Sequence, residues 1–131
     1  MMKVLFIDDD HIILTLMTHL LPPDSFQVHT AATVVEAWQL LAHTQPDVIC
    51  CDLVMPGTNG LDFLAQRQQR PELAHVPIIV LSGTNEQTLL EKAKDLGAAA
   101  NLTKPFTGKA LIALLYAVTQ SSAPAVTASN T

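Results

Sequence analysis

Five apolar runs alternate along the chain with segments of helical periodicity. The runs are KVLFI (3–7), FQVHT (26–30), PDVICC (46–51), VPIIVLS (76–82) and AAANLT (98–103). Most of them are almost continuously apolar, which is typical of strands that are buried on both faces. Because a helical pattern follows each run, the sequence predicts an α/β fold in which helices cover both faces of a parallel sheet.

The helical segments are recognised by apolar spacing and by their caps. The first has apolar residues at Ile13, Leu16, Met17 and Leu20. The second begins with a capping-box signature at Thr33 and Glu36 and has one apolar face of Val34, Ala37, Trp38 and Leu41. Two more segments cover 61–69 and 86–96, and Thr107 caps a last one with Leu111, Leu114, Leu115 and Val118. Five β–α units fit an open, doubly wound sheet with five helices and strand order 2-1-3-4-5, whereas a barrel needs eight.

The size and composition of the chain fit one domain with one core. Of its 131 residues, 49% are hydrophobic, and we expect the domain to cover 1–119. QSSAPAVTASNT (120–131) has no periodicity and predicts a disordered tail or the start of a linker. No apolar run reaches the ~18 residues that cross a membrane, and MMKVLFIDDD lacks the features of a signal peptide, so we expect a cytoplasmic protein without a membrane partner.

Charge, cysteine and histidine content argue against nucleic-acid binding, a disulfide and a histidine metal site. The net charge is −5 with seven basic residues, so direct binding to nucleic acid is not expected. Cys50 and Cys51 are adjacent within an apolar run, where a disulfide between them would be strained, so we interpret them as small buried hydrophobes. The histidines show no metal-ligand spacing.

Polar residues stand where four of the predicted strands end. They are Asp8, Asp9 and Asp10 after the first strand, Asp52 after the third, Ser82 at the end of the fourth and Lys104 after the fifth. In the predicted sheet, the carboxyl ends of these strands lie at one edge, where ligands bind in folds of this kind. The sequence therefore predicts that carboxylates, a hydroxyl and an ammonium group meet there, with Asp10 capping the following helix instead.

The grouped acids indicate a particular chemistry. Two carboxylates ~4 Å apart repel each other by about 4 kcal/mol at an effective dielectric constant of ~20, and a hard divalent cation such as Mg²⁺ offsets this repulsion. A carboxylate beside a metal ion, a lysine and a hydroxyl can also attack a phosphoryl group to form an acyl phosphate. Asp52 is the best candidate for this role because it stands alone on the central strand, between the acid cluster and Ser82 with Lys104.

Four motifs occur in an order that resembles a known family. FIDDDH, PDVICCDLVMPGTNGLDFL, PIIVLSGTNE and LGAAANLTKPF are similar to the motifs of response-regulator receiver domains of two-component signalling, which have a CheY-like, flavodoxin-like fold. The resemblance covers residues 2 to 119. It implies a phospho-accepting switch that takes a phosphoryl group from a phosphohistidine and alters a protein-interaction surface. The donor would be a sensor histidine kinase or a histidine phosphotransfer protein.

The resemblance also implies a role for each site residue. Asp9 would ligate Mg²⁺ directly, Asp8 largely through water, and Asp52 would bind the metal and accept the phosphoryl group. The backbone carbonyl of Val54 would be a further metal ligand. Ser82 would hydrogen-bond the phosphoryl group, and Lys104, expected before a cis peptide bond to Pro105, would form an ion pair with it.

One position departs from the family pattern. The family usually carries Tyr or Phe three residues before the lysine, where this chain has Asn101. Since that ring normally turns inward when the Ser or Thr moves toward the phosphoryl group, its absence leaves the coupling of phosphorylation to the surface open.

Two other functions and one assembly are weighed beside the phospho-accepting switch. A haloacid-dehalogenase-like phosphatase would use Asp8 as nucleophile and Asp10 as acid, but it leaves Asp52 and Lys104 poorly explained. A degenerate receiver would only bind partners, although the site residues are intact. Ile112, Ala113, Tyr116 and Ala117 fall outside the main apolar stripe of the last helix. Two interpretations fit: an ordinary alanine-rich helix, or a homodimer surface formed by the helices 86–96 and 108–119.

Overall fold

The computed structural model describes residues 1–55, 60–83 and 85–120, and within them five parallel strands form one sheet in the order β2-β1-β3-β4-β5. The strands are β1 (Met2–Ile7), β2 (Phe26–Ala31), β3 (Val48–Asp52), β4 (Ile78–Ser82) and β5 (Ala100–Thr103). The helices are α1 (His11–Leu20), α2 (Val34–Leu41), α3 (Gly60–Arg67), the short 3₁₀ helix η1 (Pro71–Leu73), α4 (Gln87–Asp95) and α5 (Gly108–Thr119). The predicted fold class and strand order are confirmed.

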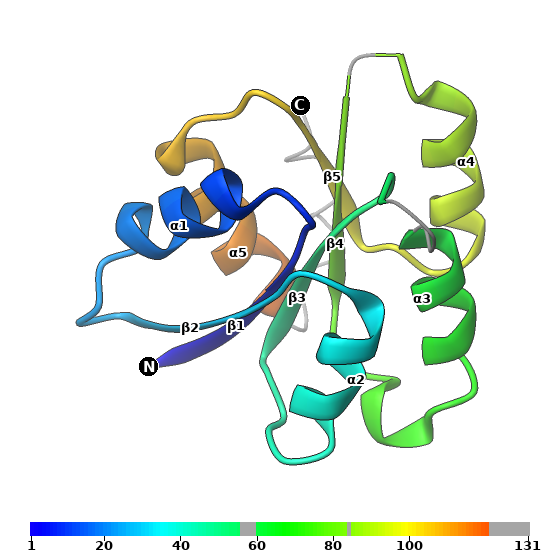
Figure 1. The fold of residues 1–131 in the computed structure, drawn as a ribbon, viewed down its shortest axis with the longest axis horizontal. Coiled ribbons are helices and arrows are strands. Elements are labelled where there is room, and N and C mark those ends of the chain that lie inside the picture. The colour runs from blue at the N-terminus through cyan, green and yellow to red at the C-terminus, as the bar shows by residue number, and fades with distance from the viewer. Residues whose placement is uncertain (56–59, 84, 121–131) are drawn as a thin grey trace.

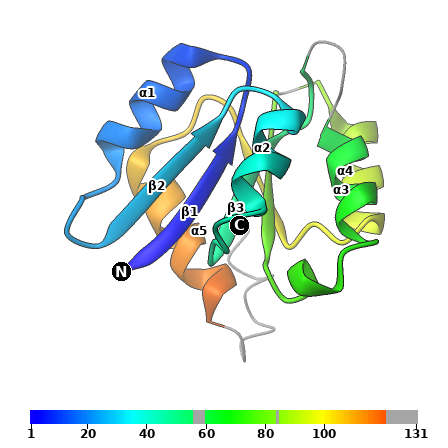
Figure 2. The same ribbon diagram turned by 60° about the horizontal axis from the view of Figure 1, so that its bottom comes forward.

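Helices cover both faces of the sheet. Figure 1 shows α1 and α5 on one face and α2, α3 and α4 on the other. In Figure 2, β1 and β2 run side by side in the same direction between α1 and α2. The buried side chains form two clusters, one under each helical layer; for example, Val4 and Phe6 of β1 face α1 and α5, while Leu5 and Ile7 face the other layer. Alternate residues of a buried strand point to opposite faces, which is why these strands are apolar throughout.

Local signals set the helix ends. Asp10 caps α1, and its side chain accepts hydrogen bonds from the backbone N–H groups of Ile12 and Ile13. Thr33 caps α2, because its side chain accepts a hydrogen bond from the Glu36 N–H at 3.0 Å. The return contact of the predicted capping box is displaced by one residue: the Glu36 side chain accepts from the Ala32 N–H at 2.8 Å rather than from that of Thr33. Gly97 ends α4 with a φ of +100°, a conformation that favours glycine.

The inward face of α1 differs from the prediction at one position. Leu16 is 46% exposed, whereas Leu14 and Met17 are buried. The apolar residues of this helix cover more than one face, so periodicity alone could not rank Leu14 above Leu16; the position of the helix on the sheet decides it.

Several sequence predictions lie outside the described residues. They concern part of the turn at 54–60, namely residues 56–59, the flanking residue 84, and most of the tail at 120–131, namely 121–131. Within the described ranges, no helix combines the length and apolarity that crossing a membrane requires.

Gly60 opens α3 directly against the strand that carries Asp52. Its backbone N–H donates to the Leu53 carbonyl at 2.9 Å. A Cβ atom at this position would overlap the backbone oxygen of Asp52 and come within 3.0 Å of the Leu53 Cα. A residue without a side chain is therefore required here for α3 to approach the end of β3.

We expect Gly60→Ala to destabilise the fold by about 1–3 kcal/mol, because the added methyl group meets backbone rather than a movable side chain. This loss outweighs the higher helix propensity of Ala, which is worth about 1 kcal/mol. Urea unfolding measures the change. Gly83→Ala is the matched control, since a Cβ there has its nearest neighbour at 3.6 Å, an ordinary contact; equal unfolding midpoints for the two variants would contradict the prediction.

Candidate functional site

The carboxyl end of β1 fixes the Asp8 carboxylate from both sides. Asp8 is 1% exposed. Its Oδ1 accepts a hydrogen bond from the Asp10 backbone N–H at 3.0 Å, and its Oδ2 accepts from the Lys104 ammonium at 2.9 Å. Because each oxygen has a fixed donor, the carboxylate is held at the edge of the sheet without further support from solvent.

Lys104 joins the ends of three strands. Its Nζ lies 2.9 Å from Asp8 Oδ2 and 3.3 Å from Asp52 Oδ1, and its side chain is 26% exposed. Burial disfavours the charged ammonium, but the hydrogen bond to Asp8 and the charges of Asp52 and Asp8 outweigh this effect and raise the pKa of Lys104. The lysine therefore stays protonated at neutral pH and neutralises part of the acidic cluster.

Three carboxylates converge at this edge. One oxygen each from Asp8, Asp9 and Asp52 lies within 4.8 Å of the other two. Asp8 and Asp52 are buried, whereas Asp9 is exposed, so the cluster opens to solvent on the side of Asp9. Carboxylate oxygens are the ligands that Mg²⁺ prefers, and one or two of them with water suffice to hold it.

Asp52 is a buried acid at the end of the central strand. It is 6% exposed. Burial and the charge of Asp8 raise its pKa to about 6, although Lys104 and the backbone N–H of Val54 act in the opposite direction. At neutral pH the carboxylate is thus mostly ionised but poorly solvated, a state that favours nucleophilic attack.

Ser82 ends β4 on the other side of β3. It is 0% exposed, and its Oγ has no hydrogen-bond partner among the described residues. A buried hydroxyl without a partner costs free energy, so an acceptor that enters the site would be bound favourably. The backbone carbonyl of Ser82 accepts a hydrogen bond from the Lys104 backbone N–H at 2.7 Å. This contact aligns the ends of β4 and β5.

The structure places the remaining predicted residues as follows. Val54, whose carbonyl was expected to bind metal, is 50% exposed just after β3, and the Lys104–Pro105 peptide bond is cis as expected. Asn101 is exposed on β5. Cys50 and Cys51 are free and fully buried, as predicted.

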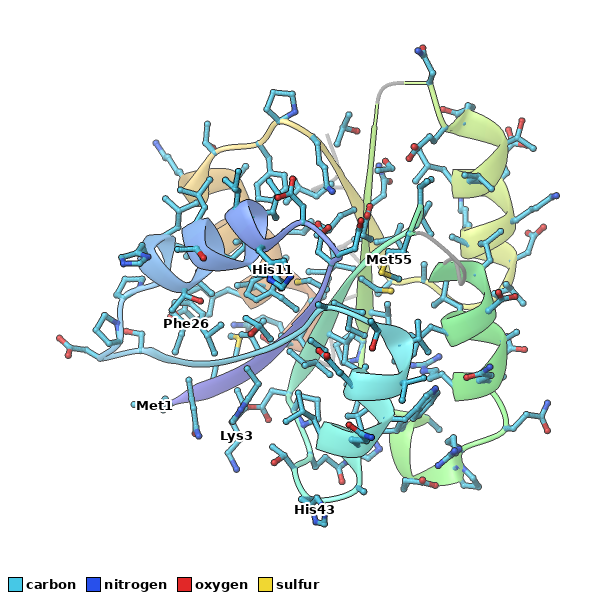
Figure 3. The ribbon with its side chains drawn as sticks, in the orientation of Figure 1. Met1, Lys3, His11, Phe26, His43 and Met55 are labelled. Carbon is cyan, nitrogen blue, oxygen red and sulfur yellow. The ribbon has the colours of Figure 1, made fainter. Side chains whose placement is uncertain are left out.

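Two side chains near the site differ in their surroundings. Figure 3 shows His11 at the start of α1, where it is exposed. Met55, labelled in the same figure, belongs to the core cluster with Phe63 and Leu64 of α3. The site thus lies between a solvent-exposed helix start and a closed apolar layer.

Two supporting residues were missed in the sequence. Glu86 accepts a hydrogen bond from the Gly83 N–H at 2.8 Å, and Gly60 gives α3 access to the Asp52 backbone. The spacing of Gly83 and Glu86 is that of half a capping box and could have indicated the first contact. The close approach at Gly60 involves backbone from another segment, which no local pattern reveals.

Asp52→Asn is expected to stabilise the protein at neutral pH in the presence of EDTA. The folded state keeps the Asp52 proton up to a pKa of about 6, whereas the unfolded state loses it near 3.9. Between these values the folded state binds more protons, so the wild type loses stability as the pH rises from about 4 to 6. At about 1.4 kcal/mol per pKa unit, the variant gains up to about 3 kcal/mol above this range.

Urea unfolding at about pH 4 and about pH 7 measures this difference. The advantage of Asp52→Asn should appear at the higher pH and vanish at the lower one. Asp24→Asn, in an exposed turn, is the control and should show neither effect. A free energy of unfolding that is equal for Asp52→Asn and the wild type at neutral pH would contradict the raised pKa.

Curated proteins resemble the chain over most of its length. It is 35% identical over 122 residues to the DNA-binding transcriptional regulator NtrC of Azospirillum brasilense, which covers 92% of this chain and 25% of that protein. It is 36% identical over 104 residues to the transcriptional regulatory protein KdpE of Staphylococcus aureus, covering 79% of this chain and 44% of the relative. The chain thus spans half or less of the length of these two relatives.

Solved structures show the same fold. A response regulator receiver domain protein from Clostridium thermocellum superimposes with a TM-score of 0.83 at 28% identity, covering 93% of this chain and 97% of the other. The chemotaxis response regulator CheY4 of Vibrio cholerae superimposes with a TM-score of 0.81 at 31% identity, covering 90% and 98%. Residues 4–116 match the family model described as response regulator receiver domain. With its carboxylate cluster at the switch point of a 2-1-3-4-5 sheet, the chain belongs to the response-regulator receiver family, whose members are regulatory phosphoacceptors.

Proposed function

We propose that Asp52 accepts a phosphoryl group from a phosphohistidine of a sensor histidine kinase or a histidine phosphotransfer protein. The observation that carries this proposal is the shared ammonium of Lys104, which lies 2.9 Å from Asp8 and 3.3 Å from Asp52. This arrangement leaves Asp52 ionised at neutral pH beside a positive charge that can move with the incoming phosphoryl group. It supports an acceptor of phosphoryl groups rather than a structural ion pair.

The transfer needs little from the protein beyond position and charge. An oxygen of Asp52 attacks the phosphorus atom and the N–P bond of the phosphohistidine breaks. The imidazole, whose other ring nitrogen carries a proton taken from solvent, leaves as the neutral base. Lys104 neutralises charge on the phosphoryl oxygens, and the Ser82 hydroxyl, which lacks a partner among the described residues, donates a hydrogen bond to one of them.

The donor set fits a magnesium ion. Asp8, Asp9 and Asp52 carry three negative charges within 4.8 Å, and the one ammonium that contacts Asp8 and Asp52 neutralises a single charge. The remainder equals the charge of one divalent cation. We propose that Asp8, Asp9, Asp52 and the Val54 carbonyl hold Mg²⁺, which when bound offsets the charge of the carboxylates and of the phosphoryl oxygens.

Exposed apolar side chains surround this edge and suit a protein donor. Ile12, Val35 and Val54 are 78%, 66% and 50% exposed, and each lies just beyond the carboxyl end of one of three adjacent strands, β1, β2 and β3. A surface with apolar groups around a charged centre matches a protein that presents a phosphohistidine on a helix. We therefore propose that these residues contact the donor.

Other predictions extend this function. A homodimer through α4 and α5 stays a prediction that is supported by the 42% exposure of Tyr116; sedimentation velocity tests it, and a monomer with and without a phosphoryl mimic would count against it. A cytoplasmic location and the absence of enzymatic activity beyond its own phosphorylation and dephosphorylation also stay predictions.

Acetyl phosphate with Mg²⁺ should label the wild type with one phosphoryl group, detected by intact mass and mapped to Asp52. Asp52→Asn should lose the label, because it removes the nucleophile, and EDTA should prevent labelling in the wild type. Lys104→Ala should label more slowly by at least about ten-fold, because it removes a charge-assisted contact worth about 1.5–3 kcal/mol.

The same variants separate this function from a phosphatase. Multiple-turnover hydrolysis of a phosphate ester that persists in Asp52→Asn and disappears in Asp8→Asn would contradict the proposal and make Asp8 the nucleophile. A chain that binds its partner but takes no label under any condition would instead be a binding module.

Ile12→Glu should slow phosphoryl transfer from the phosphohistidine donor by at least about ten-fold, because binding of a protein donor would bury the new carboxylate and remove its water. Labelling by acetyl phosphate, which is too small to cover this surface, should stay within about two-fold of the wild type. The fold should be unaffected, since an acid in the first turn of α1 is favourable. Gln69→Glu adds the same charge after α3, at the other end of the sheet, and serves as control. Equal effects of Ile12→Glu on both donors would argue against a docking role.

A further inference from the structure

One peptide group beside the site is held at both of its ends. The Ser82 carbonyl accepts a hydrogen bond from the Lys104 N–H at 2.7 Å. The N–H of the same peptide group, that of Gly83, donates to Glu86 Oε1 at 2.8 Å. The first contact belongs to the pairing of β4 with β5, whereas the second comes from a side chain outside the sheet.

The orientation of this peptide group sets the end of β4 that carries the Ser82 hydroxyl. Ser82 is 0% exposed, and its Oγ has no partner within the described ranges. Beyond it stands Gly83, whose backbone has no Cβ to restrict it. The three atoms nearest to a Cβ built at Gly83 all belong to the Glu86 carboxyl group, the closest at 3.6 Å, so the Glu86 side chain restrains this residue from outside the sheet.

The Glu86 side chain does not cap the helix that follows it. Glu86 is the N-cap residue of α4, yet its side chain makes no capping hydrogen bond to that helix. Ser, Thr, Asp and Asn are the residues that stabilise a helix from this position. The carboxylate instead reaches back to Gly83, where a charge-assisted hydrogen bond is stronger than a neutral one.

We propose that Glu86 is a positioning residue for phosphoryl transfer, which acts by fixing the Ser82–Gly83 peptide group so that the Ser82 hydroxyl faces the phosphoryl group on Asp52. The inference rests on the proposed role of Ser82. Two contacts then fix the peptide group together: the Lys104 backbone N–H binds its carbonyl oxygen, and the Glu86 carboxylate binds its N–H.

The experiment compares the rate of acetyl phosphate labelling, at saturating Mg²⁺, in the full chain and its variants. Glu86→Ala should label about ten-fold more slowly, the factor that corresponds to loss of one hydrogen bond to a charged group. Glu86→Gln should stay within about two-fold of the wild type, because its carbonyl oxygen can still accept from Gly83. Glu91→Ala, exposed on α4, is the control for loss of a negative charge on the same helix.

Two further measurements separate positioning from a general effect on stability. The ¹H–¹⁵N signal of Gly83 should shift upfield in the proton dimension in Glu86→Ala and stay near its wild-type position in Glu86→Gln. Gly83→Ala, which has space for the methyl group, should restore part of the labelling rate when combined with Glu86→Ala, because it restricts the freed backbone.

The outcomes distinguish this inference from the proposed function. If Ser82→Ala labels at the wild-type rate, the role of Ser82 is wrong and the inference falls with it. If Ser82→Ala is slow but Glu86→Ala is as fast as the wild type, only the inference is overturned. Faster labelling in both Glu86→Ala and Glu86→Gln would also overturn it, since the carboxylate would then act through its charge.

Discussion

The ammonium group of Lys104 holds the functional edge of this protein together. It contacts carboxylates from β1 and β3, and its own backbone N–H bonds to the last carbonyl of β4. Without this cation, Asp8 and Asp52 would be two buried like charges at close range, an arrangement that costs several kcal/mol. The lysine neutralises only part of the cluster, so the site remains negative and suited to a divalent cation.

Around this centre, backbone contacts decide whether the acids are correctly placed. Gly60 allows α3 to begin against the backbone of Asp52, and Asp10 combines the capping of α1 with a hydrogen bond from its backbone to Asp8. Asp52, Asp8 and the starts of α1 and α3 are therefore linked by hydrogen bonds and ion pairs. A substitution at any of these supporting positions acts on the chemistry indirectly, through the position of a carboxylate.

Helix α4 contributes one buried residue to the core. Ala93 is its one buried residue, its first residue follows Glu86, and its last turn is held where Gln68 Nε2 donates to the Leu96 carbonyl at 2.9 Å. Asn101 on the neighbouring β5 is exposed, at the position where the family resemblance predicts an aromatic ring. Besides the apolar contacts of α4 with the core, the Glu86 and Gln68 side chains make hydrogen bonds at its two ends.

Sequence alone determined the fold class, the strand order and the polar residues at the strand ends. Alternating apolar runs and helical segments allow few topologies, and the carboxyl ends of parallel strands share one edge. The Asp10 and Thr33 caps were also predictable, because they depend on residues within one turn. Tertiary structure decided the burial of Leu14 rather than Leu16, the sharing of Lys104 between two acids, the steric need for Gly60 and the contact of Glu86. Each depends on the distance between segments or on the orientation of one peptide group, quantities that periodicity and spacing do not contain.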